Sequence, residues 1–387
     1  MSEFQVRPDW MAFCLPDISE AEVQADADVI RSGWWAKGPR TMEFQKKFAE
    51  YVGAKHCIAV NSCTAALHLC VRAAGERLYG RPAIGHGAVE GRRGFCTDMT
   101  FAATLNPVVY EGGIPVFIDT ERDTWNMNPR ALERAFEIYP EVQLVVAAHL
   151  YGFPGKADEI RAVCDAHGAL LIEDAAESMG ATYRGRQTGS FGDYAAISYN
   201  GNKIITTSGG GMLLSDDEAG ISKARFWATQ AREPYPWYEH KEIGYNYRMS
   251  NIVAGIGRGQ LIHLLEHRTK KEAIYRTYEK AFQGLPVRMN PHLPYSQPNF
   301  WLSCMTIDPG CTVTPEQIRL ALEEENIESR PIWKPMHLQP VFAAHDFVTA
   351  GDNVGEDIFA RGLCLPSDIK MADSDQERVI SVIRGLF

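Results

Sequence analysis

The feature that most constrains the fold is a series of short, wholly apolar runs separated by amphipathic stretches. A strand covered on both faces has such a continuous run, whereas a strand facing water alternates. The intervening stretches, such as 129–138 and 156–166, have a helical pattern. We therefore predict an α/β chain with a largely parallel sheet. The predicted strands are 57–60, 107–110, 115–118, 144–148 and 169–172.

The pattern changes after about residue 265, where prolines interrupt shorter segments. We therefore predict a large domain over 1–265 and a smaller α+β domain over 266–387. Segment 80–94 has five glycines and no periodicity, so we expect an exposed insertion there. A phosphate-binding role for it is less favoured, because no predicted strand precedes it. Further predicted helices are 19–32, 41–52, 65–77, 252–265, 267–282, 314–326 and 374–386, and a further strand is 300–307.

Charge and hydropathy exclude several classes of partner. The net charge of −10 argues against nucleic-acid binding, which normally needs a basic face. No apolar run approaches the roughly 18 residues of a membrane span, and the polar residues 1–9 show no export signal, so we expect a cytoplasmic protein. The nine cysteines include no CxxC pair. His263 and His267 have ligand spacing on a predicted helix but no evident third ligand, so we expect no metal site.

Lys203 is the first candidate for chemistry. It follows a polar stretch and precedes Gly209, Gly210 and Gly211. An amine held there out of water could form a Schiff base with a carbonyl group, although most lysines are solvated surface charges. Asp174 ends a predicted buried strand, where open α/β sheets bind their ligands. Its carboxylate could bond a protonated ring nitrogen, or it could simply cap a helix.

Several polar groups could bind a phosphate or an aromatic ligand. Cys63 and Thr64 lie where a strand leads into a helix, a position that favours anions but is also an ordinary helix cap. Ser198 could add a hydroxyl to the same phosphate. Phe101 could stack on an aromatic ring, or it could belong to the core.

Two later segments suggest contacts with a partner or a substrate. Segment 244–251 groups aromatic and amide side chains before a glycine-bearing helix, which suits a subunit interface or internal packing. Segment 328–337 is a loop stiffened by prolines that could clamp a phosphorylated ligand or be a plain surface loop. Its candidate binding residues are Arg330, Trp333, Lys334 and His337.

The motifs, taken in order, resemble those of the pyridoxal-phosphate-dependent nucleotide-sugar aminotransferases, the DegT/DnrJ/EryC1/StrS family. The matching stretches are Ser-Cys-Thr-Ala-Ala, Thr-Phe-Ala-Ala-Thr, Glu-Asp-Ala-Ala-Glu, Ser-x4-Lys and Gly-Tyr-Asn-Tyr-Arg-Met. The resemblance covers about residues 17–366. It implies the aspartate-aminotransferase-like fold (fold type I), with a mostly parallel seven-stranded sheet. It also implies pyridoxal 5′-phosphate as cofactor and a homodimer with shared active sites.

The resemblance also implies roles for individual residues. Lys203 is similar to the lysine that forms the Schiff base and moves protons, and Asp174 to the partner of the pyridinium nitrogen. Phe101 matches the stacking position. Cys63, Thr64 and Ser198 match the phosphate site, which Asn246 would reach from the second subunit. Glu177 stands where many relatives carry Gln, near the cofactor's 3-hydroxyl group.

Segment 330–342 resembles a subgroup that aminates C4 of UDP-linked 4-keto-6-deoxy-N-acetylhexosamines, as in bacillosamine synthesis. This implies transfer of an amino group from glutamate, with the nucleotide sugar bound by segment 328–337. The alternatives are a TDP-linked keto-sugar aminated at C3 or C4, a dehydratase or aminoshikimate-type synthase on the same fold, and a sensor without catalysis. The dehydrating members replace the lysine with His, so Lys203 argues against that branch.

Overall fold

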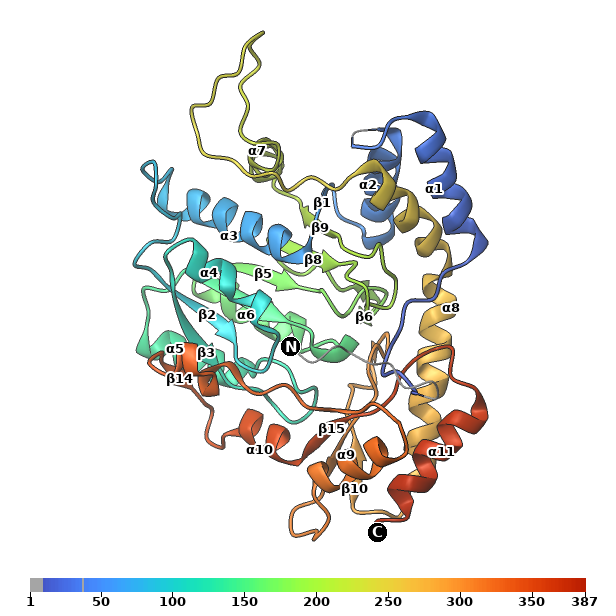
Figure 1. The fold of residues 1–387 in the computed structure, drawn as a ribbon. Coiled ribbons are helices and arrows are strands. Elements are labelled where there is room, and N and C mark those ends of the chain that lie inside the picture. Colours follow the sequence, from blue (N-terminus) through green and yellow to red (C-terminus); the bar gives the residue numbers. More distant parts are fainter. Residues whose placement is uncertain (1–9, 37) are drawn as a thin grey trace.

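The computed structural model describes residues 10–36 and 38–387. The polar residues 1–9, on which the expectation of no export signal rests, lie outside the described residues. A large sheet with helices on both faces fills the upper part of Figure 1, and the C-terminal elements lie below it. This arrangement confirms the predicted fold class.

The large sheet has eight strands in the order β1-β9-β8-β5-β4-β2-β3-β14. The neighbours from β14 to β8 pair in parallel, and β9 runs antiparallel to both β8 and β1. The family resemblance implied seven strands, and the eighth, β14, is a two-residue strand added at the edge by the C-terminal part of the chain. The strands are β1 (His56–Val60), β2 (Arg93–Thr97), β3 (Ile114–Ile118), β4 (Leu144–Ala148), β5 (Leu170–Asp174), β8 (Tyr194–Ser198), β9 (Gly211–Ser215) and β14 (Phe347–Val348).

Both faces of this sheet are buried, which explains the apolar runs. Side chains alternate between faces along a strand, so Val146 of β4 packs on the side of α3 while Val145 packs on the side of α5 and α6. Helices α4 and α7 lie with α3, and α2 and α8 cover the second face near β1 and β9. These helices are α2 (Pro39–Val52), α3 (Cys63–Tyr79), α4 (Asn106–Tyr110), α5 (Pro129–Ile138), α6 (Ala157–Ala166), α7 (Glu218–Ala228) and α8 (Asn251–Ala281).

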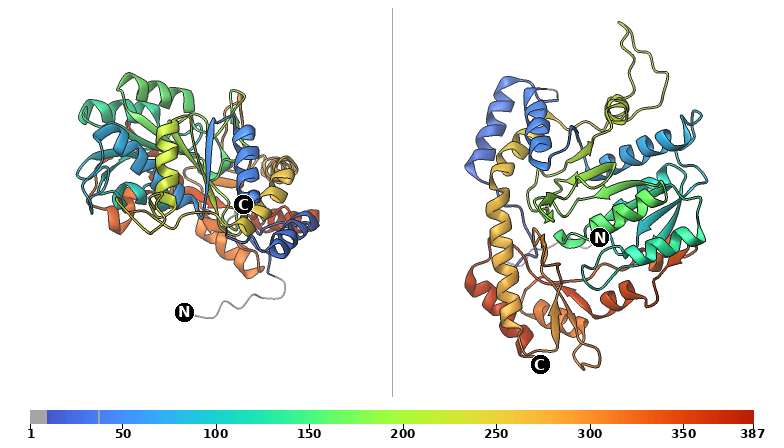
Figure 2. Two further views of the ribbon diagram at one scale, coloured as in Figure 1. Left: turned by 90° about the horizontal axis from the view of Figure 1, so that it is seen from above. Right: turned by 180° about the vertical axis from the view of Figure 1, so that it is seen from behind.

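The C-terminal part builds a second, smaller layer. Its four-stranded sheet has the order β10-β12-β15-β13 and packs with helices α9 and α11 and the second half of α8. The back view in Figure 2 shows α8 as one long helix that joins the two layers. The bounds are β10 (Val287–Met289), β12 (Cys304–Ile307), β13 (Arg330–Pro331), β15 (Gly362–Cys364), α9 (Pro315–Glu324), α10 (Val354–Arg361) and α11 (Asp373–Arg384).

The remaining elements are small. Helix α1 (Glu20–Ser32) begins with a capping box, with Ser19 as cap and Glu22 as its partner. A three-stranded sheet joins β6 (Thr182–Tyr183), β7 (Arg186–Gln187) and β11 (Ser296–Gln297). The predicted boundary between 265 and 266 falls inside α8, and the two-domain division stays a prediction.

One expectation was wrong and another was wrong in part. Segment 107–110 was predicted as a strand and is helix α4, because Pro107 sits at its start, where a missing N–H costs nothing. A run of four apolar residues cannot by itself distinguish the two. Segment 80–94 is not wholly exposed: Ala88 and Val89 are buried, and a Cβ on Gly87 would strike the backbone of Glu111.

Across residues 10–36 and 38–387, no helix is both long and apolar enough to cross a bilayer. Within the same residues, no group of three or more His, Cys, Asp or Glu side chains could hold a metal ion. The ring of His267 instead contacts the carbonyl oxygen of Ile204 at 2.9 Å.

Candidate active site

A cavity of about 300 Å³ lies at the carboxyl edge of the large sheet. Strands β4, β5 and β8 are parallel neighbours and therefore end at one edge, which places His149, Asp174 and Ser198 together. The first turn of α3 closes a second side, and Trp301 and Trp333 from the C-terminal part close a third. Eight of the predicted residues line this cavity: Cys63, Thr64, Phe101, Asp174, Glu177, Ser198, Lys203 and Trp333.

Lys203 presents its amine inside the cavity, on the loop that follows β8. Its side chain is only 12% exposed. The Nζ atom lies 3.4 Å from Oε1 of Glu177 and 3.9 Å from the ring centroid of Trp301. The surface-lysine alternative is therefore wrong, because the side chain is mostly covered and the amine contacts a carboxylate and an indole face.

Asp174 ends β5 as a buried carboxylate. Its Oδ2 accepts a hydrogen bond from the Thr104 hydroxyl at 2.7 Å, and its Oδ1 accepts one from the Ala176 N–H at 3.0 Å. Burial raises the pKa of Asp174, and the positive charge of Lys203 opposes that rise. A cationic group placed beside this carboxylate would therefore be strongly stabilised.

Glu177 lies three residues after Asp174, in the turn that follows β5, and is also buried. Its Oε2 accepts the Tyr151 N–H at 2.6 Å. Burial raises the pKa of Glu177 to about 7, although Lys203 acts to lower it. Tyr151 holds a left-handed backbone conformation (φ 55°), a strain that the surrounding contacts must maintain.

The start of α3 forms the side of the cavity that could bind an anion. Ser62 caps the helix by accepting the Ala65 N–H, which leaves the earlier first-turn N–H groups without partners inside the helix. A Cβ on Gly211 would lie 2.7 Å from the Cys63 nitrogen, so only glycine lets β9 pass this close to the helix start. Ser198, paired with Gly211 in the sheet, lines the same region.

An aromatic wall faces these polar groups. Phe101 is 59% exposed, so the core alternative for it is wrong. Its ring lies 5.5 Å from that of Trp333, which in turn lies 5.1 Å from Tyr151. The Trp333 N–H donates to the Tyr151 hydroxyl at 2.9 Å, which fixes the C-terminal segment against the large sheet. A flat ligand therefore has an exposed ring on which to stack.

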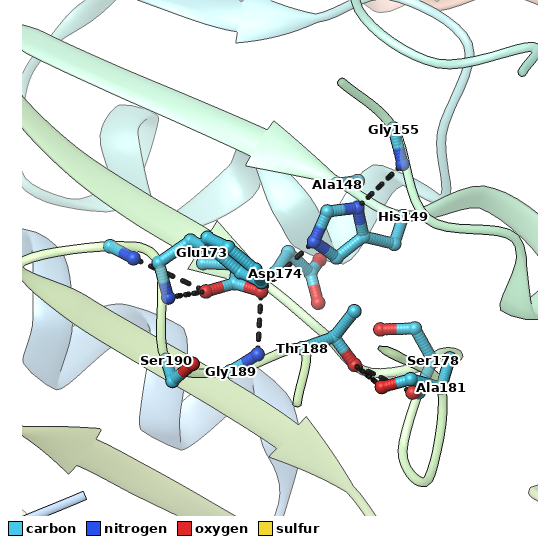
Figure 3. A network of polar contacts seen from close by, with 12 residues as sticks. Ala148, His149, Gly155, Glu173, Asp174, Ser178, Ala181, Thr188, Gly189 and Ser190 are labelled. Atoms are coloured by element: carbon cyan, nitrogen blue, oxygen red, sulfur yellow. Dashed lines mark hydrogen bonds and ion pairs between the residues drawn. The ribbon is translucent and has the colours of Figure 1, made fainter. Parts of the chain in front are cut away.

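Glu173, the neighbour of Asp174 on β5, points to the other face and anchors the strand end (Figure 3). It accepts N–H groups of Gly189, Phe191 and Gly192 and faces the His149 Nε2 at 2.9 Å. The Nδ1 of His149 accepts the Gly155 N–H, so the ring carries its proton on Nε2. Burial acts to raise the pKa of Glu173, but these hydrogen bonds outweigh it and lower the pKa.

Four predicted residues lie outside the cavity lining. Asn246 is exposed on the segment before α8, and Arg330 pairs with Glu328. Lys334 is half-buried beside the aromatic wall.

His337 differs most from its expected role, because both of its ring nitrogens are engaged. The Asp98 carboxylate lies 2.8 Å from Nδ1, and the Glu356 carboxylate lies 2.9 Å from Nε2. It thus braces α10 against the end of β2 rather than facing a substrate.

Three of the cavity residues that sequence reasoning missed are His149, Thr104 and Trp301. His149 directly follows β4, so the rule that ligands bind at strand carboxyl ends could have found it. Thr104 lies within the motif that contains Phe101, but its bond to Asp174 depends on the tertiary fold. Trp301 comes from the smaller layer, and no local pattern predicts that it reaches Lys203.

A family model, curated sequences and solved structures each match nearly the whole chain. The model of the DegT/DnrJ/EryC1/StrS aminotransferase family matches residues 16–384. EpsN of Bacillus subtilis, whose name designates a pyridoxal phosphate-dependent aminotransferase, is 47% identical over 380 residues, covering 96% of this chain and 94% of EpsN. The GDP-perosamine synthase of Caulobacter vibrioides is 37% identical over 381 residues, covering 95% of this chain and 98% of the synthase. A crystal structure of a DegT DnrJ EryC1 StrS aminotransferase from Brucella abortus has a TM-score of 0.84 at 27% identity, covering 95% of each chain.

Proposed function

The chain belongs to the DegT/DnrJ/EryC1/StrS aminotransferase family, and on that premise we propose that it transfers the amino group of glutamate to a nucleotide-linked 4-keto-6-deoxy sugar. Sugar aminotransferase activity follows from the family. The particular acceptor that we propose is a UDP-linked 2-acetamido-2,6-dideoxy-hexos-4-ulose. The observation that carries the proposal is the largely covered Lys203 amine, which contacts Glu177 in a cavity that Asp174 also lines.

Aminotransferases of this family use pyridoxal 5′-phosphate, and the cavity residues fit that group. Phe101 offers a ring face, Asp174 a buried carboxylate for a ring nitrogen, and the start of α3 unpaired N–H groups for a phosphate. When bound, the cofactor supplies an aldehyde and a ring that accepts electrons from the carbon losing its proton. Cys63, Thr64 and Ser198 are the proposed phosphate ligands.

The chain's own residues then have distinct tasks. Asp174 holds the proton on the ring nitrogen, because its buried charge is stabilised by a cation. Lys203 is the group placed to take a proton from one carbon and return it to another. The indole face of Trp301 shields the amine from water, and the Lys203 side chain is only 12% exposed.

We further propose that Trp333, Lys334 and Arg330 bind the nucleotide sugar, since the segment that carries them borders the cavity at Trp333. We also propose a homodimer. The exposed side chain of Asn246 does not line the cavity of its own chain, which supports a contact with the phosphate site of a second copy.

A GDP-linked keto-sugar is a second candidate acceptor, because the GDP-perosamine synthase of Caulobacter vibrioides is 37% identical over nearly the full chain. The test is incubation of the pyridoxal-phosphate-loaded protein with glutamate and a panel of UDP-, GDP- and TDP-linked 4-keto sugars. The proposal expects 2-oxoglutarate together with an aminated UDP-sugar. Preference for the GDP- or TDP-linked sugar would replace the proposed acceptor. Loss of a sugar hydroxyl without amination would place the protein among the dehydratases.

A further inference from the structure

The carboxylate of Glu177 is the one anionic group that contacts the Lys203 amine in the described part of the chain. The two atoms, Oε1 and Nζ, lie 3.4 Å apart. The Glu177 side chain is buried at 8% exposure, and the Lys203 side chain is mostly covered at 12%. Bulk water therefore has little access to the amine, and a proton leaving Nζ needs an acceptor inside the cavity.

The position of Glu177 is fixed independently of Lys203. Its Oε2 accepts the Tyr151 N–H, and its own carbonyl oxygen accepts the Asn299 amide at 2.7 Å. The other contact of Nζ is the face of Trp301, whose indole N–H donates to the carbonyl oxygen of Asn202. An indole face cannot take a proton, so the carboxylate is the available base.

We propose, on the basis of the function proposed above, that Glu177 is the proton acceptor that frees the Lys203 amine to attack the cofactor's aldehyde. In this step an N–H bond of the ammonium breaks, and its electron pair stays on Nζ as the nucleophilic lone pair. An O–H bond forms on Oε1. The ammonium–carboxylate pair becomes an amine–carboxylic acid pair without any further reactant. The proton returns to Nζ when the amine is released.

The groups whose charge is coupled to that of Glu177 include a second carboxylate, two thiols and a phenol. Asp174 acts on it as a like charge. Burial raises the pKa values of the Cys63 and Cys304 thiols and of the Tyr151 phenol well above their ordinary range, so these three stay uncharged. The pKa of Glu177 is raised to about 7 by burial. Glu177 is therefore ionised, and able to accept a proton, above that pH and neutral below it.

The test measures capture of the cofactor by Lys203, not turnover. Cofactor-free wild-type protein, E177Q and E177D are mixed with pyridoxal 5′-phosphate between pH 5.5 and 8.5, fixed with borohydride at short times, and analysed by mass spectrometry of the Lys203 peptide. E177Q keeps an oxygen that can accept the Tyr151 N–H. E242Q is the matched control, because it also removes a partly buried carboxylate paired with a lysine, Lys223, outside this cavity.

We expect wild-type capture to rise through a step near pH 7 and E242Q to match it. E177Q should capture at least about a hundredfold more slowly at pH 8 and lack the step, the scale expected for loss of a positioned base. E177D should recover part of the rate. The infrared carboxyl band that disappears in cofactor-free E177Q should titrate near pH 7 in the wild type.

Cofactor capture that is not slowed by E177Q would overturn the inference. If Glu177 only held the ammonium by its charge, removing that charge would favour the neutral amine, and E177Q would capture as fast as the wild type or faster. Normal wild-type capture and amination with an unaffected E177Q rejects this inference alone. A wild-type protein that captures no cofactor on Lys203 rejects the proposed function, and the inference with it.

Discussion

Replacing Asp174 with asparagine separates what this carboxylate does for catalysis from what it does for folding. Asparagine has the same shape, and its amide oxygen can still accept the Thr104 hydroxyl or the Ala176 N–H that Asp174 now binds. The variant therefore removes a buried negative charge with little change in packing.

The expected loss of activity follows from burial. Asp174 is 5% exposed, so its pairing with a protonated ring nitrogen takes place out of water. Removing one partner of a buried pair costs about 3–5 kcal/mol. At about 1.4 kcal/mol per factor of ten, kcat/KM for glutamate should fall by roughly two to three and a half orders of magnitude.

The folding effect has the opposite sign. Burial raises the pKa of Asp174, which means that the ionised carboxylate is unfavourable in the cofactor-free protein. Cofactor-free D174N should therefore melt no lower than the wild type, while the gain in melting temperature on adding pyridoxal 5′-phosphate should shrink. Stopped-flow measurement of the glutamate half-reaction and thermal melts with and without cofactor check both parts. A D174N variant within threefold of wild-type activity would refute the assigned role.

Three further predictions concern the surroundings of the site. E173Q should lower the melting temperature by about 4–6 °C, because breaking this buried network costs about 3–5 kcal/mol against an unfolding entropy of about 0.8 kcal/mol/K for a chain of this size. Because the pKa of Glu173 is lowered in the folded protein, the stability that its charge contributes is lost as pH falls through the folded-state pKa. The difference in melting temperature between E173Q and the wild type should therefore narrow in acid, and a constant difference would contradict this. Trp333→Ala should raise KM for the nucleotide sugar roughly tenfold, the scale of a lost stacking contact, and leave the glutamate half-reaction unchanged. Steady-state kinetics with each substrate check this, and an equal effect on both substrates would contradict it. Burial acts to lower the pKa of His337, but Asp98 and Glu356 raise it overall, so its stabilisation is present at low pH and lost as pH rises through the folded-state value. Melts of His337→Gln should therefore differ from wild type more at pH 6 than at pH 9, and the reverse order would show that the charged form is not the one that braces α10.

Local sequence patterns could predict the sheet and much of the site, because both depend on strand ends. The apolar runs at 144–148 and 169–172 correspond to β4 and β5. His149 directly follows β4 and Asp174 ends β5, and parallel strands bring such ends together. The same reasoning failed at 107–110, where a run too short to show periodicity proved to be α4. Nor could it predict the contact between His337 and Asp98, because the two residues are 239 positions apart in the sequence.

Contacts between the two layers were the least predictable part of the site. Trp301 reaches Lys203, and Trp333 reaches Tyr151, only because the chain after α8 returns to the carboxyl edge of the large sheet. Family resemblance placed Glu177 near the cofactor, but the Tyr151 N–H that fixes it and the burial that raises its pKa to about 7 emerge only from the tertiary structure.

The most direct test of the central claim follows the nitrogen atom itself. Wild-type protein loaded with pyridoxal 5′-phosphate is given ¹⁵N-labelled glutamate and the nucleotide-linked 4-keto sugars of the panel, and the sugar products are examined by mass spectrometry and NMR. We predict a ¹⁵N-amine on the sugar ring with one equivalent of 2-oxoglutarate, and no transfer by the Lys203→Ala variant. A sugar product without ¹⁵N, or undiminished transfer by Lys203→Ala, would contradict the account.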